Sequence, residues 1–435
     1  MSDRVRLCND RAVFRSGCGL LSVAKVSSAW NDHSQYGLPI SMTARTPVIL
    51  QVLPALTMGG LERGAIEIAD AIVQGGGEAL VASRQGPLLV HLRHAGAKHL
   101  VLDLKSKSPF AIRRRARDLQ RIIRENGVDL VHARSRAPAW VAWLACRREG
   151  VPLVTTWHGV HGARWWGKKR YNSVLARGAR VIAISRFISK RLTEEYGVGP
   201  DRLRTIPRGA DPSIFDPAQV SGERILALLE QWNVPDGVRI ILMPARLTPW
   251  KGQRVLVAAL AHLQKMDIAP WVCVLAGPAK DQKFAKALLE QAEALGVSEN
   301  LRFAGTCTDM PAACSLASVV VAPSLRPEPF GRVLVEAQMM GCPVIGSAQG
   351  AMMETVLPNE TGLVVAPGDP VALADALAAV LNLDREALDY LAENARAHVL
   401  RHYTTRLMQS ATLGVYDELL GTQMRAIFDG NTHEH

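Results

Sequence analysis

Short apolar segments alternate with longer amphipathic ones along most of this chain, in two successive sets. Each apolar segment is bounded by turn residues, which is typical of a buried parallel strand. The first set of predicted strands is Val48–Leu53, Glu78–Ser83, Lys98–Leu102, Asp129–Ala133, Pro152–Thr156 and Arg180–Ile184. The second set, which follows a loop-rich segment, is Ile240–Met243, Val272–Ala276, Leu301–Phe303, Val319–Ala322, Pro343–Gly346 and Leu363–Val365. This alternation favours doubly wound parallel sheets, so we expect an α/β protein with two Rossmann-like domains facing a central cleft.

The composition is that of an ordinary globular protein and excludes several other classes. Of the 435 residues, 48% are hydrophobic and 21% are charged, which excludes wholesale disorder and collagen-like repeats. The longest apolar runs fall far below the roughly 18 residues that a membrane-spanning helix requires. The 7 cysteines form an odd number without a CxxC pair, which indicates reduced thiols in a cytoplasmic protein.

Residues 1–46 differ from the rest of the chain and are interpreted as an N-terminal extension. They carry scattered arginines and serines but no amphipathic period. The apolar run Gly19–Ala24 is shorter than the roughly 7–15 residues of a secretory signal core. We expect this extension to be disordered or to reflect a mis-assigned start, because translation from Met42 would place a short polar lead directly before the first strand.

Charge is distributed unevenly along the chain. Residues 1–215 contain 34 basic and 16 acidic residues, whereas residues 216–435 contain 17 basic and 24 acidic residues. The excess concentrates in residues 101–191, which hold 21 basic and 5 acidic side chains and five of the 9 tryptophans. Such a region favours an anionic partner, which could be membrane headgroups, a phosphorylated glycolipid or nucleic acid.

Common nucleotide and metal motifs are incomplete or missing in the sequence. Gly162–Lys169 reads GARWWGKK, but it is one residue short of a P-loop, and Lys169 replaces the Ser or Thr that holds Mg²⁺. No GxGxxG follows a predicted strand, and no two aspartates have DxD spacing. We therefore expect neither nucleotide hydrolysis nor hydride transfer, and we predict no metal site.

The most informative segment is Pro323–Gly350, which reads PSLRPEPFGRVLVEAQMMGCPVIGSAQG. Glu328 precedes Pro329, which disfavours helix there, and Gly331 begins a predicted helix whose second turn carries Glu336. The N–H groups at that helix N-terminus can bind a phosphate, and the two carboxylates can accept hydrogen bonds from hydroxyl groups on either side. This combination suits a sugar nucleotide. In isolation, the same pattern also suits an N-capping carboxylate followed by a solvated helix glutamate.

Further motifs occur in order around this segment. They are MGGLERGAIEIADAI at Met58–Ile72, DLVHARS at Asp129–Ser135, TWHG at Thr156–Gly159, VIAISRFI at Val181–Ile188, IPRGADPSIFDP at Ile206–Pro217, PARLTPWKG at Pro244–Gly252, LAGP at Leu275–Pro278 and FAGTCTDMP at Phe303–Pro311. Together with Glu-x7-Glu, they resemble retaining glycosyltransferases of family 4, which have the GT-B fold, over residues 47–416. The stretch PEPFGRVLVEAQMMGCPVIGS also resembles bacterial lipopolysaccharide-core enzymes that transfer mannose or glucose.

The resemblance implies a domain arrangement and a reaction. Residues 47–210 would form the acceptor domain and residues 211–402 the donor domain, and a helix within 403–435 would return to the first domain. The enzyme would transfer a hexose from a nucleotide-diphosphate sugar with retention of configuration. No carboxylate is placed as a nucleophile, so we expect front-face attack, in which the departing phosphate accepts the proton of the acceptor hydroxyl.

The resemblance further implies roles for the matched residues. Arg246 and Lys251 would neutralise the diphosphate in place of a metal ion, and His158 would lie beside the donor sugar. Glu328 would bind the hydroxyls of the transferred sugar. The predicted catalytic residues are therefore His158, Arg246, Lys251 and Glu328.

Donor binding would involve a wider set of positions. Glu336 would accept hydrogen bonds from the ribose hydroxyls, and Gly59 and Gly60 would allow backbone to approach the diphosphate closely. The predicted donor-binding residues are Gly59, Gly60, Arg246, Lys251, Glu328, Pro329, Phe330, Gly331 and Glu336. Two positions depart from the family pattern: Arg208 stands where asparagine is usual, and Gln349–Gly350 replaces a more common Gly-Gly.

A basic and aromatic surface is predicted on the acceptor domain. Arg114, Arg117, Arg121 and Arg124 recur at helical spacing opposite an apolar stripe, and Trp165, Trp166, Lys168 and Lys169 follow in a loop. We expect this surface to rest on the cytoplasmic membrane and to meet an anionic glycolipid acceptor, with a lipopolysaccharide core as the first candidate. The alternative is a glycosyltransferase for exopolysaccharide or polyprenyl-diphosphate glycan assembly. The alternative without a binding role is a solvated helix face with two core tryptophans.

Two other classes of function remain open at this point. A GT-B-like epimerase or phosphorylase would share the cleft but would not need the basic surface. A nucleic-acid-binding protein would be compatible with a pI near 9.5 but would not need Glu328 or Glu336. No zinc knuckle, RNP or basic-region pattern occurs in the sequence, so we expect no nucleic-acid partner.

Overall fold

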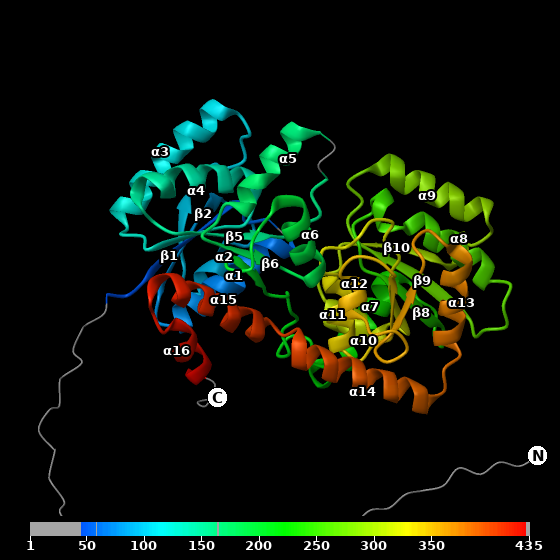
Figure 1. Cartoon of the computed structure of the whole chain (residues 1–435). Coiled ribbons are helices and arrows are strands. Elements are labelled where there is room, and N and C mark those ends of the chain that lie inside the picture. The colour runs from blue at the N-terminus through cyan, green and yellow to red at the C-terminus, as the bar shows by residue number, and fades with distance from the viewer. Residues whose placement is uncertain (1–44, 58, 163–164, 432–435) are drawn as a thin grey trace, which may run out of the picture. The chain divides into compact units, whose positions relative to one another are not determined.

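The computed structural model describes residues 45–57, 59–162 and 165–431. The predicted N-terminal extension lies outside the described residues, apart from its last two positions. From residue 46 onward, the described chain contains two separate parallel sheets with helices between successive strands, as Figure 1 shows. The predicted fold class, two Rossmann-like α/β domains, is therefore confirmed.

The first sheet has seven parallel strands in the order β3-β2-β1-β4-β5-β6-β7. Their bounds are β1 Val48–Ala55, β2 Glu78–Arg84, β3 Lys98–Val101, β4 Leu130–Ala133, β5 Leu153–Trp157, β6 Arg180–Ala183 and β7 Leu203–Thr205. Six of them lie where the apolar segments predict. The short edge strand β7 was not predicted, because its sequence LRT has no apolar run and its side chains are only half-buried or exposed.

The second sheet has six parallel strands in the order β10-β9-β8-β11-β12-β13. Their bounds are β8 Arg239–Met243, β9 Trp271–Ala276, β10 Leu301–Gly305, β11 Val319–Ala322, β12 Val344–Ser347 and β13 Leu363–Val365. In both sheets the strand order reverses beside the first strand, between β1 and β4 and between β8 and β11. Ligands of such sheets bind outside the carboxyl ends of the strands near this reversal.

Helices cover both faces of the first sheet. The helices of this half are α1 Gly60–Gln74, α2 Leu89–His94, α3 Pro109–Glu125, α4 Arg136–Glu149, α5 Trp166–Asn172 and α6 Arg186–Tyr196, with a 3₁₀ turn η1 at Ser173–Ala176. Apolar residues of α3 and α4 share one core with the strands, and those of α1 share another core with the C-terminal helices α15 Thr405–Leu420 and α16 Met424–Gly430. The two groups of helices lie on opposite sides of the sheet in Figure 1.

The second half is built in the same way. Its elements are α7 Gly222–Trp232, α8 Gln253–Leu263, α9 Gln282–Ala294, α10 Met310–Leu316, α11 Arg332–Met339, α12 Met352–Thr355, α13 Pro370–Leu381 and α14 Arg385–His402, with 3₁₀ turns η2 Pro217–Gln219, η3 Pro249–Lys251 and η4 Ser298–Asn300. The eight-residue helix α11 starts directly after Gly331, and it is the predicted helix that carries Glu336.

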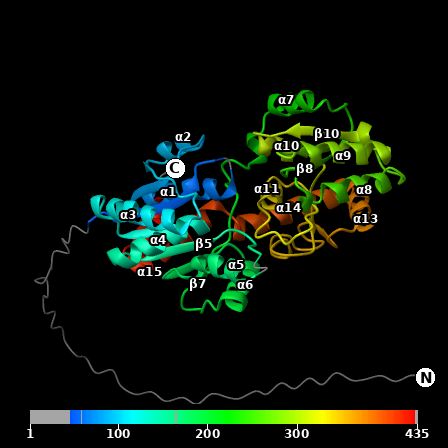
Figure 2. The same ribbon diagram turned by 90° about the horizontal axis from the view of Figure 1, so that it is seen from above.

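The chain passes between the two sheets twice, and the two crossings pair with each other. The backbone N–H of Ala210 donates to the carbonyl of Tyr403, and the N–H of Thr405 donates to the carbonyl of Ala210, both at 2.9 Å. After this crossing, α15 Thr405–Leu420 and α16 Met424–Gly430 pack on α1, and Figure 2 shows α15 beneath the first sheet. The C-terminal helix thus contributes to the core of the first half.

Two further sequence expectations concern the cysteines and the membrane. Five cysteines lie among the described residues and all are free thiols; burial raises the pKa of Cys146 and of Cys342 to about 12. Their thiols therefore stay protonated and act as small core groups. No helix in the described part of the chain is long and apolar enough to cross a membrane.

Candidate active site

Lys251 and Glu328 form a buried ion pair where the loops after β8 and β11 meet. The Lys251 Nζ lies 2.6 Å from Glu328 Oε1, and the two side chains are 20% and 8% exposed. The hydroxyl of Ser324 donates to the same carboxylate oxygen at 2.7 Å. One oxygen of Glu328 therefore receives both internal contacts, while no hydrogen bond reaches its other oxygen from the residues that the structure describes.

The backbone of Glu328 is held by the loop after β12. The N–H of Ala351 donates to the carbonyl of Glu328 at 3.0 Å, and Gly350 pairs with Glu328 as an isolated bridge. Gly350 has φ of +64°, and a Cβ there would lie 2.6 Å from the Glu328 carbonyl oxygen, so this position requires glycine. The departure Gln349–Gly350 therefore keeps the one glycine on which the position of Glu328 depends.

Glu336 is oriented by an arginine one helical turn earlier. The Arg332 Nε donates to Glu336 Oε1 at 2.7 Å, and the Glu336 side chain is 8% exposed. The Arg332 Nη2 also donates to Oε1 of Glu67, which lies in the second turn of α1, at 3.2 Å. Burial alone would lower the pKa of Arg332, but the carboxylates of Glu336 and Glu67 raise it overall. The guanidinium thus remains charged and links α11 to α1.

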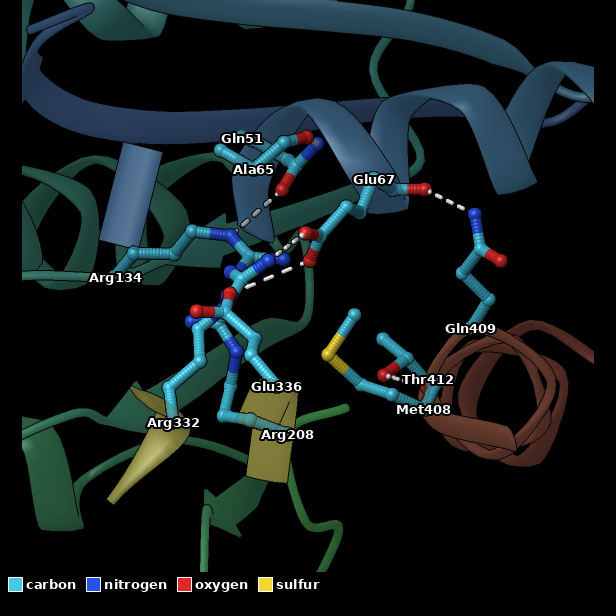
Figure 3. Close-up of polar contacts among 10 residues, drawn as sticks. All are labelled: Gln51, Ala65, Glu67, Arg134, Arg208, Arg332, Glu336, Met408, Gln409 and Thr412. Carbon is cyan, nitrogen blue, oxygen red and sulfur yellow. Dashed lines mark hydrogen bonds and ion pairs between the residues drawn. The ribbon is translucent and has the colours of Figure 1, made fainter. Parts of the chain in front are cut away.

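Arg208, the residue that replaces the family asparagine, joins this cluster. Its Nη2 lies 3.4 Å from Glu67 Oε2, and its side chain is 7% exposed. The guanidinium also packs on Gly64, where a Cβ would come within 2.6 Å of the same nitrogen. Burial lowers the pKa of Arg208 to about 10, although the nearby carboxylate of Glu67 opposes that shift. Figure 3 shows the carboxylate of Glu67 reaching from α1 toward the guanidinium groups of Arg208 and Arg332, with Glu336 beside these two arginines.

His158 lies close to this cluster, directly after β5. Both of its ring nitrogens are buried and have no hydrogen-bond partner among the described residues. Burial, followed by the charges of Arg208 and Arg134, lowers the pKa of His158 well below its ordinary value. The imidazole is therefore neutral at neutral pH, and it can donate one hydrogen bond to a ligand and accept another.

A second layer of buried polar groups supports His158 and Arg208 from the first sheet. The Arg134 Nε donates to Gln51 Oε1 at 2.7 Å, and the Gln51 amide donates to the carbonyl of Ala65 in α1 at 2.8 Å. The two ring nitrogens of His132 lie 2.7 Å from the hydroxyls of Tyr416 and Thr156. Because Tyr416 belongs to α15, the returning helix contacts this buried layer directly.

Contacts between the two halves surround the same region. The Ser185 hydroxyl, at the start of α6, donates to the carbonyl of Pro329 at 2.8 Å. The Glu354 carboxylate of α12 accepts from the backbone N–H groups of Arg186 and Phe187, the first two residues of α6. Phe330 is buried and contacts the ring of Tyr403, with the ring centres 5.8 Å apart. The loop that carries Glu328 is therefore held from both halves.

The remaining predicted donor residues are less constrained. Arg246 is exposed, and no ion pair involving its side chain occurs within the described ranges. Gly59 and Gly60 begin α1, and the space around Gly60 is open, which would allow close approach of a ligand. The Glu62 carboxylate lies against Gly59, so a negative charge also stands at this loop.

The predicted surface residues are exposed on α3 and α5. Arg114, Arg117, Arg121 and Arg124 all face solvent, and Trp165 and Trp166 are 60% and 76% exposed. The alternative prediction that both tryptophans belong to the core is therefore wrong. Two of the four arginines have partners: Arg121 lies 3.9 Å from Glu125 and Arg124 lies 3.3 Å from Glu149. Lys169 is exposed, whereas Lys168 is only partly so.

Sequence reasoning missed several residues of this site. Glu67, Arg332 and Arg134 were not singled out, although the i,i+4 spacing of Arg332 and Glu336 was a visible signal for a helix pair. No sequence signal linked Glu67 to Arg332, which is 265 positions away. In the described part of the chain, no group of three or more His, Cys, Asp or Glu residues is arranged to hold a metal ion.

Known families match both halves. The family described as Glycosyltransferase Family 4 matches residues 58–214, and the family described as Glycosyl transferases group 1 matches residues 226–398. The chain is similar to a D-inositol 3-phosphate glycosyltransferase of Salinispora tropica, with 31% identity over 324 residues, or 69% of this chain and 66% of that protein. The chain thus spans about two thirds of the length of this curated relative.

Solved structures agree with the fold. A glycosyltransferase from Rickettsia africae is 34% identical, with a TM-score of 0.80 over 86% of this chain and 99% of that one. WaaG, a glycosyltransferase involved in lipopolysaccharide biosynthesis, is 21% identical with a TM-score of 0.65, over 86% of this chain and 100% of that one. At that identity, the second likeness extends to the fold alone.

Proposed function

This chain belongs to glycosyltransferase family 4, and from that premise we propose that it transfers a hexose from a nucleotide-diphosphate sugar to an anionic acceptor, with retention of configuration and without a metal ion. The observation that carries the proposal is the pair of carboxylates flanking the start of α11. Glu328 and Glu336 each hold a cation through one oxygen, which fixes the carboxylate. The other oxygen of each is left to accept hydrogen bonds from sugar and ribose hydroxyls.

The cations of the site suit a diphosphate leaving group. Lys251, at the end of the loop after β8, forms an ion pair with Glu328. Arg246 lies earlier in the same loop. In this proposal the two cations and the N-terminus of α11 stabilise the negative charge that develops as the nucleotide leaves. Glu328 acts as a sugar-binding group, because its contacts with Lys251 and Ser324 orient it as an acceptor.

His158 has a complementary role in this proposal. Its two buried nitrogens, which have no partner in the part of the chain that the structure describes, offer one donor and one acceptor to hydroxyls of the donor sugar. Front-face attack requires no enzyme nucleophile, since the departing phosphate oxygen takes the proton from the acceptor hydroxyl. The carbon–oxygen bond to the acceptor forms as the bond to the diphosphate breaks.

Two acceptors are each favoured by a different observation. The exposed arginines of α3, with Trp165 and Trp166, favour a glycolipid at a membrane surface, such as a lipopolysaccharide core or a polyprenyl-diphosphate glycan. The name of the curated relative favours a phosphorylated polyol of the inositol phosphate class. Both acceptors are anionic, which agrees with the charge of the first half.

A thermal-shift panel tests the donor. UDP, GDP, ADP and their sugars are added with and without Mg²⁺, and a ligand at a hundred times its Kd should stabilise the protein by about 2.7 kcal/mol. We expect a shift with one nucleotide class, the same with and without Mg²⁺, that is lost in Glu336→Gln. Glu290→Gln is the matched control, because Glu290 is a solvent-exposed glutamate whose partner is also exposed. No shift with any nucleotide, or an unchanged shift in Glu336→Gln, would reject the proposed donor site.

A further inference from the structure

A cavity of about 380 Å³ lies beside the candidate site and is lined mainly by basic residues. It is bounded by the first turn of α4, the loop after β5, α5 and the loop after β11. The lining residues are Arg136, Val160, His161, Gly162, Lys168 and Arg326. Its volume falls in the range of about 300–1,000 Å³ that is typical of small-molecule sites.

The cavity lining carries three positive charges and no carboxylate, and one of the three, Arg326, has an exposed side chain. Within residues 45–57, 59–162 and 165–431, no acidic side chain forms an ion pair with Arg136, Lys168 or Arg326. This differs from the neighbouring cluster, in which Glu67 and Glu336 compensate the arginines. These charges are therefore available to a ligand anion or to solvent ions.

Arg136 is held in place without being neutralised. The Arg136 Nη1 donates to the side-chain oxygen of Asn172 at 2.9 Å, and its guanidinium lies 5.7 Å from the centre of the Tyr171 ring. Both contacts orient the planar guanidinium, which matches phosphate oxygens in a bidentate manner. Lys168 adds a point charge from α5, and Arg326 adds a second guanidinium from the other half of the molecule.

His161 contributes a neutral polar group to the same cavity. Its ring packs against Trp157, with the ring centres 5.4 Å apart. Burial, followed by the charges of Arg136, Arg191 and Lys168, lowers the pKa of His161 to about 4. At neutral pH the imidazole is uncharged, so it can hydrogen-bond to a phosphate oxygen or to an adjacent hydroxyl.

The position of the cavity relates it to the acceptor and not to the donor. Arg326 precedes Glu328 by two residues, and His161 follows His158 by three, so a ligand here would lie next to the sugar end of the site. Neither Arg246 nor Lys251 lines the cavity, and neither does the start of α11. The groups assigned to the donor diphosphate are thus separate from this set.

We propose that this cavity binds a phosphate ester carried by the acceptor, through Arg136, Lys168, Arg326 and His161. The proposal rests on the proposed glycosyl transfer and names the chemistry by which that reaction selects its acceptor. A water molecule takes up about 30 Å³ in the liquid, so a cavity of this volume also accommodates the sugar or polyol to which the phosphate is attached. Because the charges converge on one space, the bound phosphate orients the acceptor toward the donor sugar.

Binding to the purified full chain, measured by calorimetry, tests this proposal with D-inositol 3-phosphate and unphosphorylated inositol. We expect the phosphate ester to bind at least about tenfold more tightly, since hydrogen bonds between charged groups are stronger than those between neutral groups. Lys168→Gln and Arg326→Gln should each weaken binding of the phosphate ester about fivefold and leave inositol binding unchanged. Lys190→Gln is the matched control, because Lys190 lies in the same half with its side chain 74% exposed.

A second arm identifies the source of the phosphate. Phosphatidylcholine vesicles with and without phosphatidic acid present the same phosphate monoester on a lipid. Weakened binding to phosphatidic acid in Lys168→Gln and Arg326→Gln, with no binding of the soluble ester, assigns the cavity to a lipid-carried phosphate. The proposal is overturned if the phosphate adds no affinity in either arm, or if neither variant changes the affinity for it.

The outcome is separable from that of the proposed function. Nucleotide binding in the thermal-shift panel depends on Glu336 and on the loop after β8. Neither Glu336 nor that loop lines this cavity. Phosphate-ester binding without any nucleotide shift would reject the proposed transferase reaction and retain the cavity as a phosphate site. A nucleotide shift without phosphate-ester binding would reject the cavity proposal alone.

Discussion

The arginines of α3 and the arginines around Glu67 are the same side chain in opposite environments. Arg121 on α3 has a side chain that is 66% exposed, and its partner Glu125 lies 3.9 Å away. Arg208 has a side chain that is 7% exposed, and its guanidinium is packed between Glu67 and Gly64. Water screens the first pair, whereas the second has lost most of its hydration and depends on its protein partners.

The difference in burial separates charges that stabilise the fold from charges that are available to a binding partner. In the buried cluster, Glu67 bridges Arg208 and Arg332, so three elements depend on one carboxylate. On α3, the charge is available to an external anion because little of it is used internally. Stability measurements should therefore respond to the cluster, and binding measurements should respond to α3.

Acidification should separate the two regions most strongly. His132, His158 and His161 are held neutral by burial, whereas α3 contains no histidine. Well above pH 6.5 these histidines are neutral in both the folded and unfolded states and do not affect the pH dependence of stability. Below it, the unfolded chain binds protons that the native histidines do not, so stability falls. With a native pKa of about 4, His161 alone should cost about 2 kcal/mol at pH 5.

Urea unfolding at pH 7, 6 and 5 measures this loss. The variant His161→Gln cannot titrate at that position, so its stability should fall less steeply between pH 6.5 and 5 than that of the parent chain. Equal slopes for the two proteins would show that His161 is not held neutral in the folded state.

Removal of Glu67 is expected to have the next largest effect. Glu67→Ala takes the bridging carboxylate from Arg208 and Arg332 and leaves Arg208 without a carboxylate partner. Breaking a buried ion pair in this way costs about 3–5 kcal/mol, and we expect the lower value because Arg332 retains Glu336. The urea midpoint measures the change in the free energy of unfolding.

Glu125→Ala is the matched control for that substitution. It removes the partner of Arg121 on the surface, where exposed ion pairs contribute about 0–1 kcal/mol. If the two substitutions destabilised the protein equally, the contrast between a structural cluster and a binding surface would be wrong. A second check is Arg208→Asn, which restores the residue usual in the family and should reduce the additional cost of Glu67→Ala.

The smallest effect on stability is expected from the α3 arginines. Replacing Arg114, Arg117, Arg121 and Arg124 with glutamine should change the free energy of unfolding by less than about 0.5 kcal/mol for each residue. Binding to vesicles containing an anionic phospholipid should fall by about 1 kcal/mol per arginine, or about fivefold each, measured by sedimentation. Arg385→Gln, on α14 with its side chain 88% exposed, should not alter vesicle binding.

Much of the fold followed from local patterns. Twelve strands were predicted close to where they lie, because a buried parallel strand needs a short apolar run and each such run is visible on its own. Two short elements were not predicted. The edge strand β7 has the sequence LRT, and the helix α2 has only six residues, so neither provides enough periodicity to be recognised.

The site was predictable in part. Glu328, Glu336 and Lys251 were identified from motifs, and their positions at strand ends followed from the predicted alternation. The contacts of these residues were not predictable. Lys251 pairs with Glu328, which is 77 positions away, and Arg332 pairs with Glu67, because the tertiary fold brings the ends of different strands and helices together.

The sequence alone determined the two parallel sheets, the order of their motifs and the family, since each depends on residues that are close in the chain. Only the tertiary structure decided which charges are compensated. Arg208 and Arg332 share Glu67, whereas Arg136, Lys168 and Arg326 converge on a cavity without a carboxylate. The amino-acid composition does not distinguish these basic residues. Their surroundings differ because burial removes water, and a charge without water needs a partner that only the folded chain or a ligand can supply.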